Sequence, residues 1–210
     1  MVFGVSRAVL GAAAVPECSC QKSSNPLSLR AVTATRQIHN LALIGFMGTG
    51  KSSVGRLVAD ILRFTFLDTD RVIEARSGKT ISDIFAQDGE LVFRQWEARV
   101  VEELTRRTGT VIATGGGLPA NEANLASLKT HALVVCLWAS PQAIWERTRG
   151  HSHRPLLNDP DPLEKIRQLL ALRGPYYRQA DVLLNTELRS VREVAQQVIH
   201  QFRMAPSGRA

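Results

Sequence analysis

Residues 45–53 read GFMGTGKSS, and residues 45–52 fit the phosphate-binding pattern G-x-x-x-x-G-K-S. A short apolar run, LALIGF at residues 41–46, leads into the glycines, and the segment that follows has apolar residues along one helical face. A strand that turns through glycines into a helix binds polyphosphate, because the loop amides and the helix N-terminus both attract anions. The sequence therefore predicts a nucleotide site in which Lys51 reaches the β- and γ-phosphates and Ser52 binds Mg²⁺.

Apolar runs and amphipathic segments alternate along the rest of the chain. We expect strands at FTFLD, TVIATGGG, ALVVCLW and DVLLNT, which occupy residues 64–68, 110–117, 132–138 and 181–186. We expect short helices over residues 70–78 and 80–89, the second opened by Thr80 with Asp83 as a capping box. Longer helices are expected at residues 90–107 and near 121–129, 141–149, 162–173 and 190–203. This alternation predicts a three-layer α/β fold with a parallel sheet.

Composition narrows the class of protein. The chain has 210 residues, of which 44% are hydrophobic and 21% charged, ordinary values for one globular domain. The net charge is +7, but the 26 basic residues are scattered and aromatic residues make up only 6%, so we expect no nucleic-acid surface. An apolar run of about 18 residues is lacking, which argues against a membrane-spanning helix. Three cysteines form no disulfide framework and favour a reducing compartment.

Residues 1–36 differ from the rest, with many small residues, Ser and Thr, and a single acid, Glu17. Three interpretations compete: a disordered extension, an organelle transit peptide and a secretory signal. The secretory signal is the weakest, because the apolar stretch is short and the cleavage pattern is poor. We expect a poorly ordered extension, then one folded domain over residues 37–204 and a tail over residues 205–210.

Two carboxylates end the second expected strand, in the stretch FLDTD. Ligands bind at the carboxyl ends of the strands in open α/β sheets, so nucleotide and acceptor should meet at this edge. The spacing suits a division of roles, with Asp68 toward the metal and Asp70 toward a hydroxyl of the acceptor. Asp is also a frequent cap of a following helix, and the spacing alone leaves both roles of Asp70 open.

Two further segments carry candidate binding groups. The glycines at residues 115–117 follow an expected strand and would let a ligand lie against backbone amides, although a plain tight turn has the same sequence. Arg94 and Glu97 are three residues apart on an expected helix, so their side chains can pair. Either this is a solvated ion pair, or Glu97 orients Arg94 toward an anionic group of the substrate. Helical spacing does not decide between them.

The stretch GHSHRPLLNDPDP at residues 150–162 has the composition and size of a lid between two helices. Arg154 within it would stabilise charge on a transferring phosphoryl group, as an arginine finger does. Arg173 stands directly before Gly174 and Pro175, where we expect the helix to end. That break would aim the Arg173 side chain.

These motifs, in this order, resemble the shikimate kinase family. The resemblance covers roughly residues 40–202 and rests on GFMGTGKSSVGR, LDTD, DIFAQDGELVFRQWE, TGGG, RPLL and LRGPYYRQAD. The glycine loop alone would indicate only a P-loop protein, whereas the whole set is specific. The resemblance implies a P-loop kinase sandwich with a five-stranded parallel sheet, substrate-binding helices over about residues 69–100 and a mobile lid over about residues 150–161.

The resemblance also implies which residues bind the nucleotide and the metal. Ser52 and Asp68 would hold one Mg²⁺, with the carboxylate acting through water. Lys51, Asp70 and Arg154 would carry the catalysis. ATP would contact residues of the glycine loop and two later arginines, namely Gly48, Thr49, Gly50, Lys51, Ser52, Ser53, Arg154 and Arg189.

On the acceptor side, the resemblance implies that Arg94 and Arg173 clamp the carboxylate of shikimate. Two arginines suit one carboxylate because each can form paired hydrogen bonds with it. Asp70 would bind the acceptor hydroxyl and help to take its proton, and Gly116 would offer its backbone to a substrate hydroxyl.

The implied reaction transfers the γ-phosphoryl group of ATP to the 3-hydroxyl of shikimate, a step toward chorismate and the aromatic amino acids. A gluconate kinase would share Lys51 and Ser52 but need not have Asp70 with the two arginines. A non-catalytic homologue would usually have lost one of these residues. We expect a monomeric bacterial enzyme of the cytoplasm with no nucleic-acid or membrane partner. A plastid is the alternative location if residues 1–36 are a transit peptide.

Overall fold

The computed structural model describes residues 36–149 and 160–205. Within them, one parallel sheet has the strand order β2-β3-β1-β4-β5. The strands are β1 (Asn40–Ile44), β2 (Thr65–Asp68), β3 (Thr110–Ala113), β4 (Ala132–Trp138) and β5 (Val182–Asn185). Every expected strand is present, and the three-layer α/β prediction is confirmed.

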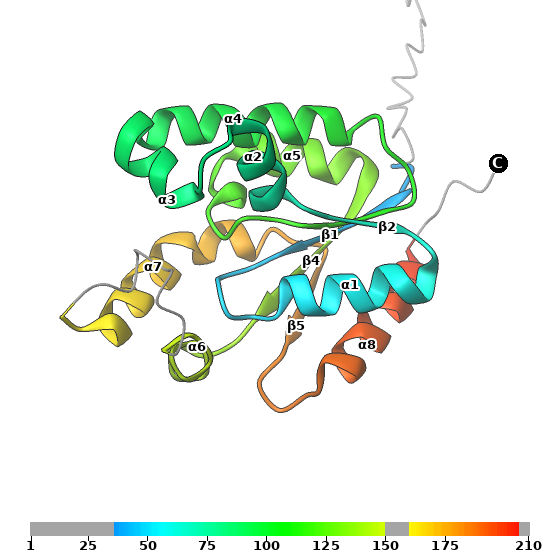
Figure 1. The fold of residues 1–210 in the computed structure, drawn as a ribbon. Helices are drawn as coiled ribbons and strands as arrows, with labels where there is room; N and C mark the ends of the chain where they lie inside the picture. Colours follow the sequence, from blue (N-terminus) through cyan, green and yellow to red (C-terminus); the bar gives the residue numbers. More distant parts are fainter. Residues whose placement is uncertain (1–35, 150–159, 206–210) are drawn as a thin grey trace, which may run out of the picture. The chain divides into compact units, whose positions relative to one another are not determined.

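Helices connect the strands and cover both faces of the sheet (Figure 1). Because consecutive parallel strands need such crossovers, this arrangement follows from the alternation in the sequence. The helices are α1 (Lys51–Leu62), α2 (Thr69–Ser77), α3 (Ile81–Asp83), α4 (Gly89–Leu104), α5 (Glu122–His131), α6 (Pro141–Thr148), α7 (Pro162–Tyr177) and α8 (Val191–Met204), with a π-helix η1 (Ile84–Asp88) and a 3₁₀-helix η2 (Leu118–Ala120). No helix in the described part of the chain has the length and apolarity needed to span a membrane.

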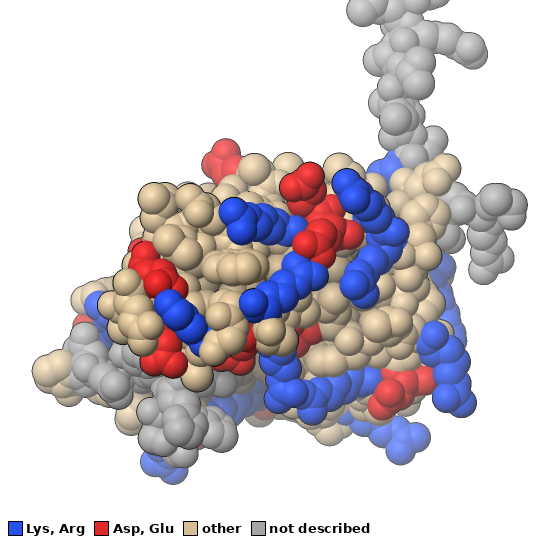
Figure 2. All heavy atoms as spheres, turned by 45° about the horizontal axis from the view of Figure 1, so that its top comes forward, with Lys and Arg blue, Asp and Glu red and all other residues tan. Residues whose placement is uncertain are grey.

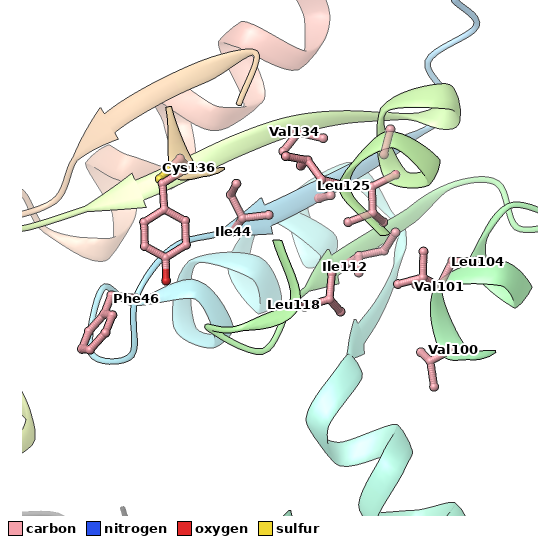
Figure 3. Close-up of a cluster of buried hydrophobic side chains, with 14 of the residues drawn as sticks. Ile44, Phe46, Val100, Val101, Leu104, Ile112, Leu118, Leu125, Val134 and Cys136 are labelled. Carbon is pink, nitrogen blue, oxygen red and sulfur yellow. The ribbon is translucent and has the colours of Figure 1, made fainter. Parts of the chain in front are cut away.

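The central strand β1 is buried on both faces and divides the core in two. Its side chains alternate, so Leu41 and Leu43 pack with residues of α1 and α8, such as Val58 and Val198. Ala42 and Ile44 belong to the other cluster, which includes residues of α4, α5, α6 and α7. Figure 3 shows Ile44, Ile112 and Val134 of the sheet in this second cluster, with Val100, Val101 and Leu104 of α4. The near-continuous apolar strands of the sequence reflect this two-sided burial.

The expected helix over residues 80–89 is only partly α-helical. A single turn, α3, is followed by the π-helix η1, which runs directly into α4. The Asp83 N–H donates to Thr80 Oγ1 at 3.1 Å, so Thr80 does cap the helix. The Asp83 carboxylate accepts from the Thr80 hydroxyl at 2.7 Å instead of from the Thr80 backbone N–H, so the capping box predicted there was wrong. Ser190 and Glu193 form a full capping box at the start of α8.

The expected helix end at Gly174 and Pro175 was also wrong. Helix α7 continues through both residues to Tyr177 and carries Pro175 inside it. A proline clashes with the Cβ of the preceding residue in an α-helix, but Gly174 has no Cβ, so this clash is relieved. Arg173 is therefore oriented by a continuous helix and not by a break.

The face in Figure 2 carries acidic and basic side chains next to one another. Arg76 pairs with Glu103 at 2.6 Å and Lys79 pairs with Asp88 at 2.8 Å. Such exposed pairs contribute little to stability. Acidic side chains nevertheless lie between the basic ones on this face and divide them into small groups, although the net charge of the chain is +7.

Asn40 closes the amino-terminal edge of the sheet with a buried hydrogen-bond network. Its Oδ1 accepts from the Thr110 N–H at 2.9 Å, and its Nδ2 donates to the Arg107 carbonyl at 2.6 Å. The same Nδ2 lies 2.9 Å from His131 Nδ1, and burial lowers the pKa of His131, which favours the neutral ring that can accept this bond. One fully buried amide thus joins β1 to the segments that precede β3 and β4.

We expect Asn40→Ala to lower the free energy of unfolding by about 2–4 kcal/mol, because it leaves the Thr110 N–H and the Arg107 carbonyl without a partner. Urea unfolding followed by circular dichroism measures this. The control is Thr65→Ala at the exposed first residue of β2, for which we expect a loss below about 1 kcal/mol. Equal unfolding midpoints for the two variants would contradict the role of Asn40.

Candidate active site

A cavity of about 1050 Å³ opens at the carboxyl ends of the strands. The loop between β1 and α1 lines one part of it, and residues of α2, α4, α7 and the 115–117 glycines line the other. This is the edge at which open α/β sheets bind their ligands. The cavity brings together Lys51, Ser52, Asp68, Asp70, Arg94, Gly116 and Arg173, which the sequence pointed to separately.

The β1–α1 loop depends on glycine at its first position. Gly45 has a φ of 132°, and a Cβ there would lie 2.1 Å from the Leu137 carbonyl oxygen of the neighbouring strand. The loop curls back on itself, so Lys51 Nζ donates to the carbonyls of Gly45 and Phe46, each at 2.9 Å. Thr49 Oγ1 donates to the same Phe46 carbonyl at 2.8 Å. These bonds hold the lysine ammonium over the loop, where it can meet the phosphates of a nucleotide.

Ser52 and Asp68 form the candidate metal site. Ser52 Oγ donates to Asp68 Oδ2 at 2.8 Å, and both residues line the cavity. The described residues contain no group of three or more His, Cys, Asp or Glu side chains that could hold a metal. One hydroxyl and one carboxylate nevertheless fit Mg²⁺, which is bound by few protein oxygens and completes its shell with phosphates and water.

Asp68, and not Asp70, caps helix α2. Asp68 Oδ1 accepts from the Asp70 N–H at 3.2 Å, so the capping alternative for Asp70 was wrong. The Asp70 side chain is turned toward the cavity, and its Oδ1 is buried without a hydrogen-bond partner among the described residues. Burial raises the pKa of Asp70 to about 6, with further increases from Asp68 and Glu74 and an opposing effect of Lys51. Such a carboxylate is a stronger base than an ordinary Asp.

The pair of Arg94 and Glu97 is not a solvated surface ion pair. Arg94 Nη1 donates to Glu97 Oε2 at 2.7 Å, and the Glu97 side chain is 0% exposed while that of Arg94 is 27% exposed. Glu90 accepts from the other side of the guanidinium at 2.7 Å. Burial raises the pKa of Glu97 to about 6, although Arg94 opposes the shift. Two carboxylates thus fix the direction of one guanidinium at the cavity wall.

Each of the three glycines at residues 115–117 lies against a different functional side chain. A Cβ at Gly115 would lie 2.4 Å from Asp70 Oδ1, and one at Gly117 would lie 2.8 Å from Arg94 Nη1. A Cβ at Gly116 would lie 3.6 Å from Arg173 Nη1. The segment is therefore not a plain tight turn, because side chains at its ends would displace the groups that line the cavity.

Some residues of the site gave no signal in the sequence. Thr69 Oγ1 accepts from the Gly115 N–H at 2.9 Å and holds the glycine segment beside α2. Arg147 of α6 lines the cavity, with Nη1 3.4 Å from the Gly48 carbonyl and Nη2 2.6 Å from the Thr186 carbonyl. It thereby joins the nucleotide loop to the segment after β5. Only the three-dimensional contact distinguishes Arg147 from the other arginines of the chain.

Three predicted residues are not among those that the cavity brings together. Thr49 is buried in the nucleotide loop, with 1% of its surface exposed, and does not line the cavity. Arg154 lies outside the described residues, as does most of the expected lid. Arg189 is exposed, donates to the Asn185 carbonyl at 2.8 Å and does not line the cavity. In the described residues, the contact between Arg189 and a nucleotide therefore has no geometric support.

This geometry suits phosphoryl transfer from a nucleotide to a small anionic acceptor, and known proteins point the same way. A family model described as shikimate kinase matches residues 47–203. The chain belongs to the shikimate kinase family. A shikimate kinase from Thermodesulfovibrio yellowstonii is 43% identical over 170 residues, which cover 81% of this chain and 98% of that protein.

Solved structures of the family have the same fold. A shikimate kinase from Acinetobacter baumannii in complex with shikimate superposes with a TM-score of 0.77 at 38% identity, covering 82% of this chain and 97% of that one. A gluconokinase from Sinorhizobium meliloti shares only the fold, with a TM-score of 0.53 at 19% identity over 81% of this chain and 95% of that one. The predicted P-loop kinase sandwich is confirmed.

We expect Asp70→Asn to raise the free energy of unfolding by about 1–2 kcal/mol at pH 7. The pKa of Asp70 rises from 3.8 to about 6 on folding, so its favourable contribution is complete below pH 3.8 and is lost as the pH rises through about 6. A neutral amide avoids this loss, and the gain should disappear near pH 4. Denaturant unfolding at both pH values measures it.

The matched control for this prediction is Asp60→Asn at an exposed position of α1, for which we expect a change below about 0.5 kcal/mol at either pH. A variant Asp70→Asn that is no more stable than the wild type at pH 7 would show that the Asp70 carboxylate is not strained by its surroundings.

Proposed function

We propose that this chain transfers the γ-phosphoryl group of ATP to the 3-hydroxyl of shikimate, giving shikimate 3-phosphate and ADP. The reaction belongs to the pathway that leads through chorismate to the aromatic amino acids. The observation that carries the proposal is that one cavity holds the Lys51 loop, the buried Asp70 carboxylate and the two arginines Arg94 and Arg173. The shikimate in the related Acinetobacter baumannii structure supports the choice of acceptor.

On the nucleotide side, the phosphates of ATP would lie along the loop that contains Gly48, Thr49 and Gly50, with Lys51 at the β- and γ-phosphates. Ser52 and Ser53 lie in the first turn of α1, whose N-terminus adds a favourable field for anions. Ser52 and Asp68 would hold Mg²⁺, which neutralises charge on the transferring phosphoryl group. The Ser52–Asp68 hydrogen bond shows that their oxygens already converge.

On the acceptor side, Arg94 and Arg173 would grip the shikimate carboxylate and Gly116 would offer its backbone to a hydroxyl. This clamp would place the reacting hydroxyl near Asp70, a carboxylate close enough to Lys51 for the lysine charge to lower its pKa. With a pKa of about 6, Asp70 is ionised at pH 7 and can accept the proton as the new P–O bond forms. Most of the rate enhancement would come from positioning and charge stabilisation.

Further assignments follow from the same proposal. Arg154 would stabilise the transferring phosphoryl group from the lid, and Arg189 is the weaker candidate for an ATP contact. Residues 37–204 would form the kinase domain, with residues 1–36 and 205–210 outside it. The protein would act as a monomer, as the family resemblance implies. Bacterial relatives support a cytoplasmic location, with a plastid as the alternative.

The proposal is tested by ADP release from the purified full chain with ATP and Mg²⁺. Shikimate, gluconate, AMP and no acceptor are compared at equal concentrations. We expect strong stimulation by shikimate alone, because its ring holds a carboxylate and the reacting hydroxyl at a fixed separation that suits the arginine clamp and Asp70. Gluconate has both groups but on an open, flexible chain, and AMP has no carboxylate. Stimulation by gluconate in its place, or ATP binding without any stimulation, would refute the proposed reaction.

The clamp itself is tested by Arg94→Ala. We expect kcat/KM for shikimate to fall by an amount equivalent to about 2–5 kcal/mol, because the variant removes a carboxylate partner and leaves the buried Glu97 unpaired. The control is Arg99→Ala on the same helix, where the guanidinium lies over the Trp96 ring 5.4 Å from its centroid. Arg99→Ala should stay within about twofold of the wild type. Near-normal kinetics of Arg94→Ala would remove Arg94 from the site.

A further inference from the structure

Tyr177, the last residue of α7, contacts the glycine segment of residues 115–117 from outside the cavity. Its Oη donates to the Gly116 carbonyl at 2.6 Å, and the residue is only 7% exposed. Burial raises the pKa of Tyr177 to about 12, so the hydroxyl keeps its proton and remains a donor. Gly116 lines the cavity and Tyr177 does not. The tyrosine therefore acts on the substrate side of the cleft through the backbone and not by contact with a ligand.

Gly116 lies where three segments meet. A Cβ at this position would lie 3.5 Å from the Gly45 carbonyl oxygen and 3.6 Å from the Met47 nitrogen, so the glycine segment lies directly against the nucleotide loop. It would also lie 3.6 Å from Arg173 Nη1. Arg173 precedes Tyr177 by one helical turn, so both side chains leave the same face of α7.

The nucleotide loop also contacts Arg173. The guanidinium of Arg173 lies over the ring of Phe46, 5.7 Å from its centroid. The carbonyl of Phe46 accepts hydrogen bonds from Lys51 and Thr49. One helix thus touches the glycine segment through Tyr177 and the nucleotide loop through Arg173.

The hydroxyl of Tyr177 also sets the orientation of a peptide group. A trans peptide is planar, with its carbonyl and its N–H on opposite sides. Turning the Gly116 carbonyl toward Tyr177 therefore turns the N–H of Gly117 away from α7. Within residues 36–149 and 160–205, the N–H groups of Gly116 and Gly117 donate to no other residue. They are available to a ligand in the cavity that these glycines line.

We propose that Tyr177 is a positioning residue for the acceptor, whose hydroxyl fixes the Gly116–Gly117 peptide beside the Arg173 guanidinium. The inference rests on the proposed function, since it assumes that shikimate lies against these glycines. It goes beyond that function by making α7 a single element that orients both the carboxylate clamp and the backbone donors. The nucleotide loop keeps its own bonds through Lys51 and Thr49, so ATP binding should not depend on Tyr177.

The test is Tyr177→Phe, which removes one oxygen and keeps the ring. Initial rates are measured with shikimate varied at saturating ATP and with ATP varied at saturating shikimate. We expect the KM for shikimate to rise roughly tenfold, because an unpaired buried carbonyl releases the loop, while the KM for ATP stays within about twofold. The matched control is Tyr176→Phe, a neighbouring hydroxyl without a hydrogen bond to any described residue, and it should match the wild type.

The outcomes separate the two proposals. If the wild type shows no shikimate-stimulated ADP release, the proposed function fails. If the wild type is active and Tyr177→Phe matches Tyr176→Phe, Tyr177 has no positioning role, even where the melting temperature of the variant falls. Equal increases in the KM for both substrates would assign Tyr177 to general packing and would also overturn the inference.

A second measurement does not depend on whether Tyr177→Phe folds. The chain has only two tyrosines, so 3-fluorotyrosine in the Tyr176→Phe variant labels Tyr177 alone. We expect its single ¹⁹F resonance to shift on addition of shikimate without nucleotide and to stay unchanged with gluconate. A resonance that does not respond to saturating shikimate would overturn the inference, provided that the labelled variant retains shikimate-stimulated ADP release.

Discussion

The acceptor side of the cleft depends on the absence of Cβ atoms at Gly115 and Gly117, in the segment of residues 115–117. Three side chains from α2, α4 and α7 approach this short segment so closely that ordinary residues at Gly115 and Gly117 would collide with Asp70 and Arg94. Between the two glycines, Gly116 lies against the backbone of the nucleotide loop, where a Cβ would be 3.5 Å from the Gly45 carbonyl oxygen. The nucleotide side and the acceptor side of the cavity can come close at one edge of the sheet because glycines line the space between them.

The cleft also holds buried charged groups that lower the stability of the folded protein. Asp70 and Glu97 both have pKa values raised to about 6 by burial, and each retains a buried oxygen without a described partner. Arg94 offsets part of this penalty by pairing with Glu97. Unpaired carboxylate oxygens and a directed guanidinium are groups that a ligand with hydroxyls and a carboxylate would satisfy. The site is thus organised for its ligand at some loss of stability in its absence.

Local patterns predicted the strands, most helices and several residues of the cavity, among them Lys51, Asp70 and Arg94. The β1–α1 loop was predictable because its glycines, Lys51 and Ser52 are consecutive in the chain. The π-helix η1 was not predicted, because the apolar pattern of residues 80–89 is the same for an α-helix. The passage of α7 through Pro175 was missed because the usual rule for proline does not apply where the preceding residue, Gly174, has no Cβ. The roles of Asp70 and Glu97 could not be decided from spacing, because burial distinguishes them from exposed carboxylates. Arg147 and Tyr177 escaped notice because their partners, Gly48 and Gly116, are distant in the sequence.

The strand order has a consequence for how the chain assembles. Strands β1 and β2 are made first, yet they are not neighbours, because β3 lies between them. Leu41 pairs with Val111 on one side and with Leu133 on the other, so the central strand gains its partners only after much of the chain exists. Such distant pairings slow folding and leave apolar edges uncovered in the meantime. During synthesis, β1 and α1 therefore emerge from the ribosome long before the sheet that buries them can close.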